Sequence, residues 1–161
     1  MEIMRGDESR IDDLEPLFTA MHSHHRDLGA QVLPFRTDAE AWARRRRHYA
    51  ALLESGRGHL LLAEEGGRVV GYAMVSEIGG QATLATGERM AELETLSVEE
   101  GARGQGVGRA LMDAAYAVMR ELGLTEVMLY VIDGNEGAIR FYERLGMRPY
   151  LGVMLGLVPS E

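Results

Sequence analysis

Glycine occupies three of the six positions in residues 103–108, which read Arg-Gly-Gln-Gly-Val-Gly. This stretch lies between an apolar, strand-like run at residues 93–98 and a helical pattern that begins near Val107. Because glycine lacks a Cβ, its backbone amides can come close to a ligand, and a helix N-terminus adds a partial positive charge. The sequence therefore predicts an anion site here, most simply for phosphate groups.

Two common glycine-rich phosphate motifs do not fit this stretch. A Walker A loop ends in Gly-Lys-Ser or Gly-Lys-Thr, but all 17 basic residues of this chain are arginine. A Rossmann fingerprint needs a third glycine where this chain has Arg109 or Leu111, and it belongs to the first strand–helix–strand unit. Both motifs are excluded.

Two carboxylates precede the glycine turn, and they could act on an amine. Glu92 and Glu94 are two residues apart, so on a regular strand their side chains face the same way. Two carboxylates held close together raise the pKa of at least one of them and attract cations. Such a pair could take a proton from an ammonium group as a general base. The alternative is an exposed carboxylate pair on the face of a sheet.

The elements that must position these residues follow from periodicity and turn signals. The mixed order of strand and helix patterns predicts one α/β domain over residues 1–161. Strands are expected at residues 1–5, 59–64, 68–76, 89–98 and 126–131, with one or two more within 147–158. Helices are expected from Asp12 or Asp13 to Leu28, from Thr37 or Asp38 to about Glu54, and at residues 106–122 and 136–145. A Gly-Gly turn at 65–67 predicts a hairpin, and the glycine-rich residues 78–87 predict a mobile loop.

Composition narrows the class of protein. A net charge of -8 disfavours nucleic acid as a partner, and the absence of cysteine excludes disulfides and thiolate nucleophiles. The chain has no apolar run of about 18 residues and no N-terminal signal pattern, so we expect a cytoplasmic protein without a membrane partner.

Two polar clusters have simple interpretations. His22 and His25 share a helix face, but a metal site would need further ligands that the sequence does not show, so solvated or substrate-facing histidines are favoured and no metal is expected. The arginine run at residues 44–47 would point in all directions on a helix. A solvated helix with ion pairs is therefore favoured over a nucleic-acid surface.

The spacing Arg103-x-x-Gly106-x-Gly108 resembles the acyl-CoA pyrophosphate loop of the GCN5-related N-acetyltransferase (GNAT) superfamily. Residues 94–98 are similar to the central strand of that family, and residues 135–147 are similar to its second cofactor motif. The order of elements also matches, and the resemblance is firm over residues 60–149. It implies a GNAT fold: a mixed, mostly antiparallel twisted sheet of six to seven strands, flanked by about four helices and splayed at the acetyl-CoA site.

The resemblance also implies how acetyl-CoA binds. Backbone amides of residues 103–108 would hold the pyrophosphate. Main-chain groups of Leu96 and Val98 would pair with the pantetheine, and one of their amides could polarise the thioester carbonyl. Asn135 would bind the pantetheine arm or cap the following helix, or do both. The expected acetyl-CoA-binding residues are Leu96, Ser97, Val98, Arg103, Gly104, Gln105, Gly106, Val107, Gly108, Arg109, Asn135, Ala138 and Tyr142.

Three residues are implied in catalysis. Tyr142 would protonate the departing thiolate or orient its sulfur; the alternative is a core aromatic, a role that suits Phe141 better. The expected base is the Glu92–Glu94 pair, with Glu94 ranked first and water-relayed deprotonation possible. Because the chain has no cysteine, transfer would be direct, within a ternary complex.

Two functions remain open at this stage. The leading one is acetyl transfer from acetyl-CoA to a primary amine: an aminoglycoside-like or other small amine, a polyamine, an amino acid or a protein N-terminus. The other is a non-catalytic acyl-CoA-binding sensor or interaction module on the same fold. Members of the family often form homodimers through their C-terminal strands, and the apolar residues 151–158 are compatible with that.

Overall fold

A five-stranded mixed sheet forms the centre of the computed structural model, which describes residues 1–28 and 32–159. The strands follow one another across the sheet in chain order, β1 to β5. Neighbours are antiparallel except for β4 and β5, which are parallel. The strands are β1 (Glu2–Gly6), β2 (Gly58–Glu65), β3 (Arg68–Gly79), β4 (Arg89–Val98) and β5 (Val127–Met128). The predicted mixed, mostly antiparallel α/β fold is confirmed.

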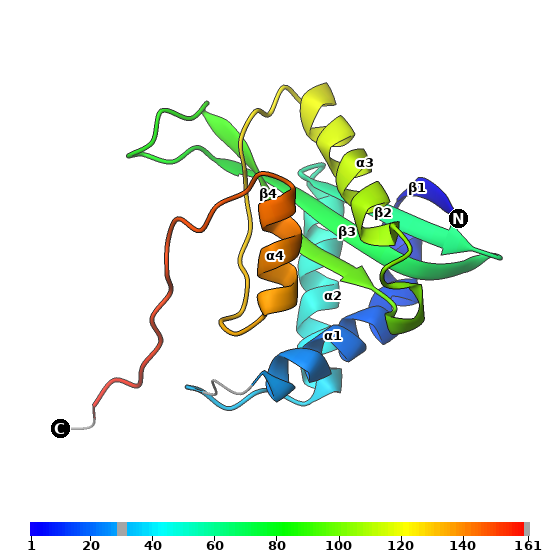
Figure 1. Ribbon diagram of the computed structural model, residues 1–161, viewed down its shortest axis with the longest axis horizontal. Helices are drawn as coiled ribbons and strands as arrows, with labels where there is room; N and C mark the ends of the chain where they lie inside the picture. Colours follow the sequence, from blue (N-terminus) through cyan, green and yellow to red (C-terminus); the bar gives the residue numbers. More distant parts are fainter. Residues whose placement is uncertain (29–31, 160–161) are drawn as a thin grey trace.

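Helices cover both faces of this sheet (Figure 1). One layer contains α1 and α2, and the opposite layer contains α3 and α4. The helical segments are η1 (Glu8–Leu14), α1 (Glu15–Asp27), α2 (Asp38–Glu54), η2 (Glu100–Ala102), α3 (Val107–Glu121) and α4 (Glu136–Arg144). The expectation of about four flanking helices is confirmed.

Strand alternation divides the core into two clusters. In β2, Leu60 and Leu62 pack toward α1 and α2, whereas Leu61 and Ala63 pack toward α3. Because successive side chains of a strand point to opposite faces, a strand covered on both sides must be apolar throughout. The uninterrupted apolar run of β2 has this origin.

The first helical segment differs from the prediction at its start. Asp7, rather than Asp12 or Asp13, is the cap, and its side chain accepts a hydrogen bond from the amide of Ser9 at 2.9 Å. The first turns are a 3₁₀ helix, so the chain turns helical earlier than the apolar period indicated. For α2, in contrast, the cap is Thr37, one of the two residues that the sequence offered.

Strand boundaries also required three corrections. The strand β3 continues to Gly79, so the following loop begins at residue 80 rather than 78. The strand β5 has two residues rather than six, because the chain pairs with β4 only at Val127 and Met128. Residues 147–158 form no strand and run away from the body of the molecule beyond α4 (Figure 1). The described residues therefore contain five strands instead of six to seven.

The central strand β4 contains a bulge at Glu94. Met74 of β3 lies opposite Thr95, but the next residue, Val75, lies opposite Leu93, so Glu94 is one residue too many. The hydroxyl of Thr95 donates to the carbonyl of Glu94 at 2.7 Å and accepts from Tyr49 of α2 at 2.6 Å. This buried hydrogen-bond chain ties the bulge to α2.

Candidate active site

The glycine turn presents bare backbone at the start of α3. Gly104 and Gly106 have φ values of 75° and 85°, a region that residues with a Cβ adopt only at a cost. Gly106 is the N-cap of α3, and no side chain caps the helix. A Cβ added at either glycine would meet nothing within 4 Å. The first amides of α3 therefore have no side-chain cap and can bind an anionic group.

Side chains of the same turn hold it against the end of β4. The guanidinium Nε of Arg103 donates to the carbonyl of Val98 at 3.1 Å. The side-chain nitrogen Nε2 of Gln105 donates to the carbonyl of Gly101 at 2.7 Å. Arg109 pairs with Asp113 one turn along α3, and the side chain of Val107 is buried in the core. These side chains have partners within the protein. The backbone of the turn is therefore the part that can contact a ligand.

The strand β4 has an open edge next to this turn. Within the described residues, β5 pairs with β4 only at Ala91 and Glu92. The amide of Glu99 donates to the carbonyl of Val70 in β3 at 2.9 Å. The N–H and C=O groups of successive strand residues point to opposite sides, so those of Leu96 and Val98 point away from β3. They face the open edge and can pair with an extended ligand.

Ser97 lies in a different position from the other expected ligand residues. Its main-chain groups face β3, and its buried hydroxyl donates to the carbonyl of Leu17 in α1 at 3.1 Å. The geometry makes Ser97 a link between β4 and α1 rather than a residue of the open edge.

Asn135 caps α4. Its side-chain oxygen accepts a hydrogen bond from the amide of Ala138 at 3.2 Å. This contact occupies the amide of Ala138, so that amide is not available to a ligand. The side-chain nitrogen of Asn135 has no partner in the described chain and can donate to one.

Tyr142 lies on α4, on the side of the sheet that α3 covers. Burial raises the pKa of its hydroxyl to about 12, and nearby Tyr116 acts in the same direction. The ring of Phe141 meets it edge-on at 5.2 Å. The hydroxyl of Tyr142 makes no hydrogen bond to the residues that the structure describes, so it can donate to a ligand.

The two carboxylates of β4 have different surroundings. Glu94 accepts hydrogen bonds from the hydroxyl of Ser76 at 2.7 Å and makes a 3.0 Å contact with Nε2 of His48, and its side chain is 12% exposed. Glu92 has no hydrogen-bond partner among the described side chains. Burial raises the pKa of Glu92, and the charge of Glu94 raises it further, while His48 and Arg45 oppose the shift.

The carboxylates and the tyrosine approach the open edge from opposite sides. The contact of Glu94 with His48 of α2 places the carboxylates toward the α1–α2 layer, whereas Tyr142 belongs to the α3–α4 layer. A thioester lying along the edge of β4 would therefore meet an amine from one side and a hydrogen-bond donor from the other. This arrangement suits transfer of an acyl group to an amine.

The family model described as "Acetyltransferase (GNAT) family" matches residues 19–147. This chain belongs to the GNAT family. A mycothiol acetyltransferase from Propionibacterium freudenreichii is 33% identical to it over 163 residues, which cover 99% of this chain and 47% of that protein. The chain thus spans about half the length of the curated relatives that it matches.

Solved GNAT-like structures share the fold. A tetramutant of the BH1408 protein from Bacillus halodurans superposes with a TM-score of 0.79 at 22% identity, covering 98% of this chain and 100% of that one. A GCN5-related N-acetyltransferase from Ralstonia eutropha JMP134 gives a TM-score of 0.78 at 22% identity, covering 97% of each chain. At these identities the likeness establishes the architecture.

Sequence reasoning found the GNAT motifs but missed two residues beside the carboxylates. Ser76 comes from β3 and His48 from α2, and both contact Glu94. His48 adjoins the arginine run at residues 44–47, which was interpreted only as a solvated helix. In that run, Arg46 forms the expected kind of ion pair, with Asp12 at 2.6 Å. His48 lies four residues after Arg44, and residues at that spacing share a helix face. This spacing was the signal that His48 and part of the arginine run lie on one surface.

The histidine cluster of α1 has structural partners. Nδ1 of His22 lies 2.7 Å from the carboxylate of Asp38, and its ring stacks on Phe18. Burial lowers the pKa of His25, and the charges of neighbouring histidines and Arg45 add to the effect. In residues 1–28 and 32–159, no group of three or more His, Cys, Asp or Glu could hold a metal ion. No helix of these residues is both long and apolar enough to span a membrane.

Proposed function

We propose that this GNAT protein transfers the acetyl group of acetyl-CoA directly to a primary amine. The observation that carries the proposal is the open edge of β4, which leads into the uncapped amides of the glycine turn. Bound acetyl-CoA would supply an activated thioester. Amides of residues 104–108 would hold its pyrophosphate, and the main chain of Leu96 and Val98 would align its pantetheine.

The carboxylate pair would handle the proton of the acceptor. Sequence reasoning ranked Glu94 first, but its oxygens are engaged by Ser76 and His48, and Glu92 has the raised pKa. A base with a pKa closer to neutrality is more effective near pH 7. We therefore assign proton removal to Glu92 and binding of the ammonium group to Glu94. A carboxylate has about four lone-pair sites, so Glu94 retains room for this contact.

Tyr142 would donate a hydrogen bond to the leaving sulfur. A phenol with a pKa of about 12 is a much weaker acid than a thiol of pKa about 8.5, so complete proton transfer is disfavoured by about 5 kcal/mol. A hydrogen bond to a charged group is worth about 1.5–3 kcal/mol. Donation without full transfer therefore accounts better for the position of this tyrosine.

Tyr142→Phe is expected to lower kcat by about 10- to 100-fold, which corresponds to loss of that hydrogen bond. The KM for acetyl-CoA should change little, because the ring remains. Steady-state kinetics on both substrates measures the two effects. Wild-type kcat in the variant would remove Tyr142 from the mechanism, and Tyr130→Phe, an exposed tyrosine outside α4, is the control.

A panel of amines tests the proposal as a whole. Purified protein is incubated with acetyl-CoA and each amine, and acetylated product is detected by mass spectrometry alongside release of free CoA. The panel contains amino acids, peptides with a free N-terminus, polyamines and aminoglycosides. It also contains amines related to mycothiol, because relatives of this chain are named mycothiol acetyltransferases. Tight acetyl-CoA binding without transfer to any amine would favour the acyl-CoA-binding sensor instead.

We further propose that the C-terminal segment, residues 147–158, packs on a second copy of the chain. Large apolar side chains of this segment are exposed to solvent: Tyr150, Leu151, Val153, Met154, Leu155, Leu157 and Val158. Contiguous exposed apolar surface is typical of an interaction site. The outer side of β5, which is not the β4 edge proposed for the pantetheine, offers a strand edge on which the segment of another copy can pair.

Removal of residues 149–161 is expected to convert a dimer into a monomer. Sedimentation velocity of the full chain and of the truncated chain measures the change. Retained acetyl-CoA affinity shows that the truncated chain is folded, and Leu84→Ser, at an exposed apolar loop residue, is the control. A full-length chain that sediments as a monomer at every concentration would contradict this proposal.

A further inference from the structure

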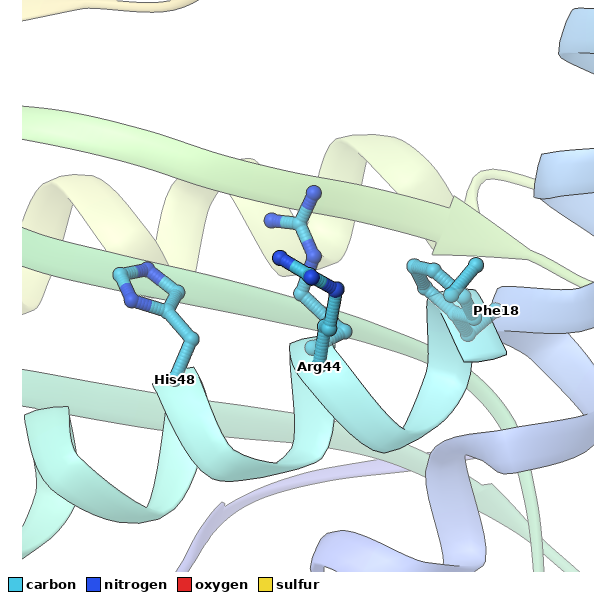
Figure 2. A pocket seen from close by; sticks show the side chains of 5 residues that line it. Phe18, Arg44 and His48 are labelled. Carbon is cyan, nitrogen blue, oxygen red and sulfur yellow. The ribbon is translucent and has the colours of Figure 1, made fainter. Parts of the chain in front are cut away.

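A shallow pocket opens between α1 and α2 on the side of the sheet that the carboxylates face. It is lined by Phe18 of α1 and by Ala41, Arg44, Arg45 and His48 of α2. The α2 residues are spaced three and four apart, so they share one helix face. Figure 2 shows Arg44 and His48 projecting from the same side of α2, with Phe18 beyond Arg44.

This pocket adjoins the site of the carboxylates at His48. His48 lines the pocket and also contacts Glu94 at 3.0 Å. Arg45 is close enough to Glu92 for its charge to act on the pKa of that carboxyl. An acceptor whose amine reaches the carboxylates would therefore extend its remaining atoms over His48 and toward the two arginines.

The positive charge of Arg45 lies next to two aromatic rings. Its guanidinium lies 5.7 Å from the ring centre of Phe18 and 5.6 Å from that of Tyr49. Across residues 1–28 and 32–159 it forms no ion pair, and every other arginine without an ion pair there is exposed, whereas Arg45 is half-buried. Removing a cation from water without an anionic partner costs free energy.

The donors of Arg45 are available. A guanidinium carries five N–H donors, and within residues 1–28 and 32–159 those of Arg45 make no hydrogen bond or ion pair. Those donors match the two oxygens of a carboxylate or phosphate. Exposed Arg44 lines the same pocket and adds a second positive charge. The pocket thus has the donor set of an oxyanion site that lies beside an ammonium site.

We infer that the acceptor carries an oxyanion as well as its amine, a molecule of the amino-acid type. This inference rests on the proposed acetyl transfer. The ammonium binds between Glu92 and Glu94, and the carboxylate binds Arg45 and Arg44. After Glu92 removes one proton, the amine nitrogen bonds to the acetyl carbon, the C–S bond breaks, and CoA leaves as a thiolate with the electron pair of that bond. The amide nitrogen then releases its second proton, and the thiolate takes up a proton from solvent. Polyamines and aminoglycosides, which are polycations, fit this pocket poorly because the arginines repel them.

The test compares acceptors that differ only in charge. Amino acids are assayed against their carboxamides, which keep the ammonium group but lack the carboxylate charge, with phosphoethanolamine as the phosphate arm and spermidine as the polycation arm. We expect kcat/KM for an amino acid to exceed that for its amide by at least 10-fold, and spermidine to be the poorest acceptor. Comparison of the amino acid with phosphoethanolamine identifies which oxyanion the pocket takes.

Substitutions test whether Arg45 causes the preference for acceptors that carry an oxyanion. Arg45→Gln should lower kcat/KM for the acceptor with an oxyanion about 10- to 100-fold, the range for loss of a charged hydrogen bond, and should lower it much less for the carboxamide. Arg45→Lys should recover part of the loss. Arg47→Gln removes an exposed arginine of the same helix that is not part of the pocket, and it should preserve the charge preference. Arg44→Gln gives a second variant at an exposed position, should Arg45→Gln fail to fold.

Three results would overturn the inference. One is a wild-type protein that prefers amines without an oxyanion, in which case the acetyl transfer itself still stands. The second is an equal loss for anionic and neutral acceptors in Arg45→Gln, which would mean that Arg45 only balances the charges of the carboxylates. The third is a failure of the folded wild type to acetylate any amine, which would overturn the proposed function as well.

Discussion

Glu92→Gln is expected to lower kcat by about 10²- to 10³-fold, in the range found for loss of a general base. The same substitution should remove the acid limb of the pH–rate profile. That limb exists because the base must be deprotonated to act, so the rate rises as pH passes through its pKa. Since burial and the charge of Glu94 raise the pKa of Glu92, the limb should lie above the pH of an ordinary glutamate.

Glu94→Gln should give a different profile. It removes a negative charge that helps to raise the pKa of Glu92, so the acid limb should remain but move to lower pH. The KM for the amine should rise because the ammonium group loses a partner. Exposed Glu88→Gln, outside the site, should leave both quantities unchanged.

Profiles of kcat and kcat/KM between pH 5 and pH 10 distinguish the possible assignments. Loss of the limb in Glu94→Gln but not in Glu92→Gln would reverse the two roles. A limb that survives unchanged in both variants would assign deprotonation to solvent.

Gly106→Ala is expected to weaken acetyl-CoA binding by at least 10-fold. The left-handed backbone at φ 85° costs an alanine about 1–2 kcal/mol, which should appear as a loss of unfolding free energy. The larger effect is local: relaxation of the turn or intrusion of the new methyl group disturbs the amides at the start of α3. Isothermal titration with acetyl-CoA and denaturant unfolding measure the two effects separately.

Gly123→Ala is the matched control. Gly123 has a left-handed φ of 71°, has nothing within 4 Å of an added Cβ, and lies just beyond the other end of α3. It should lose a similar unfolding free energy and keep full acetyl-CoA affinity. Equal affinity in the two variants would contradict the assignment of the glycine turn to the pyrophosphate.

Local signals account for the parts of the fold that the sequence predicted well. The bounds of β4 were predicted to the residue. The hairpin turn has both Gly66 and Gly67 at positive φ, as a two-glycine hairpin turn requires. The cap of α4 is Asn135 because its side chain satisfies an amide of the first turn. In each case a few neighbouring residues determine the conformation.

The predictions that failed depended on distant partners. Asp12 looks like a helix cap, but Arg46 of α2 binds it, and Asp7 performs the capping. Residues 147–158 have the apolar character of a strand, yet a strand also needs an edge to pair with. The sequence does not contain that information, because the edge is formed by residues far away in the chain.

The bulge shows why the site was only partly predictable. On a regular strand, side chains two residues apart share a face. This rule places Glu92 and Glu94 on the same face, as found, but it would also place Leu96 and Val98 on that face. Because Glu94 is an extra residue, Leu96 and Val98 instead pack toward the α3 layer. Ser76 and His48 belong to other elements, and only the tertiary structure brings them to Glu94.

The open edge of β4 also bears on the solubility of the protein. An exposed strand edge is a template on which other chains can pair and aggregate, and many proteins protect such edges with charged residues or prolines. Residues 93–98 of this edge contain only one charged residue and no proline. A ligand that forms main-chain hydrogen bonds along β4 occupies that template. On the proposed function, bound acetyl-CoA would cover this edge as an added strand does, and we expect the protein to self-associate most readily when acetyl-CoA is absent.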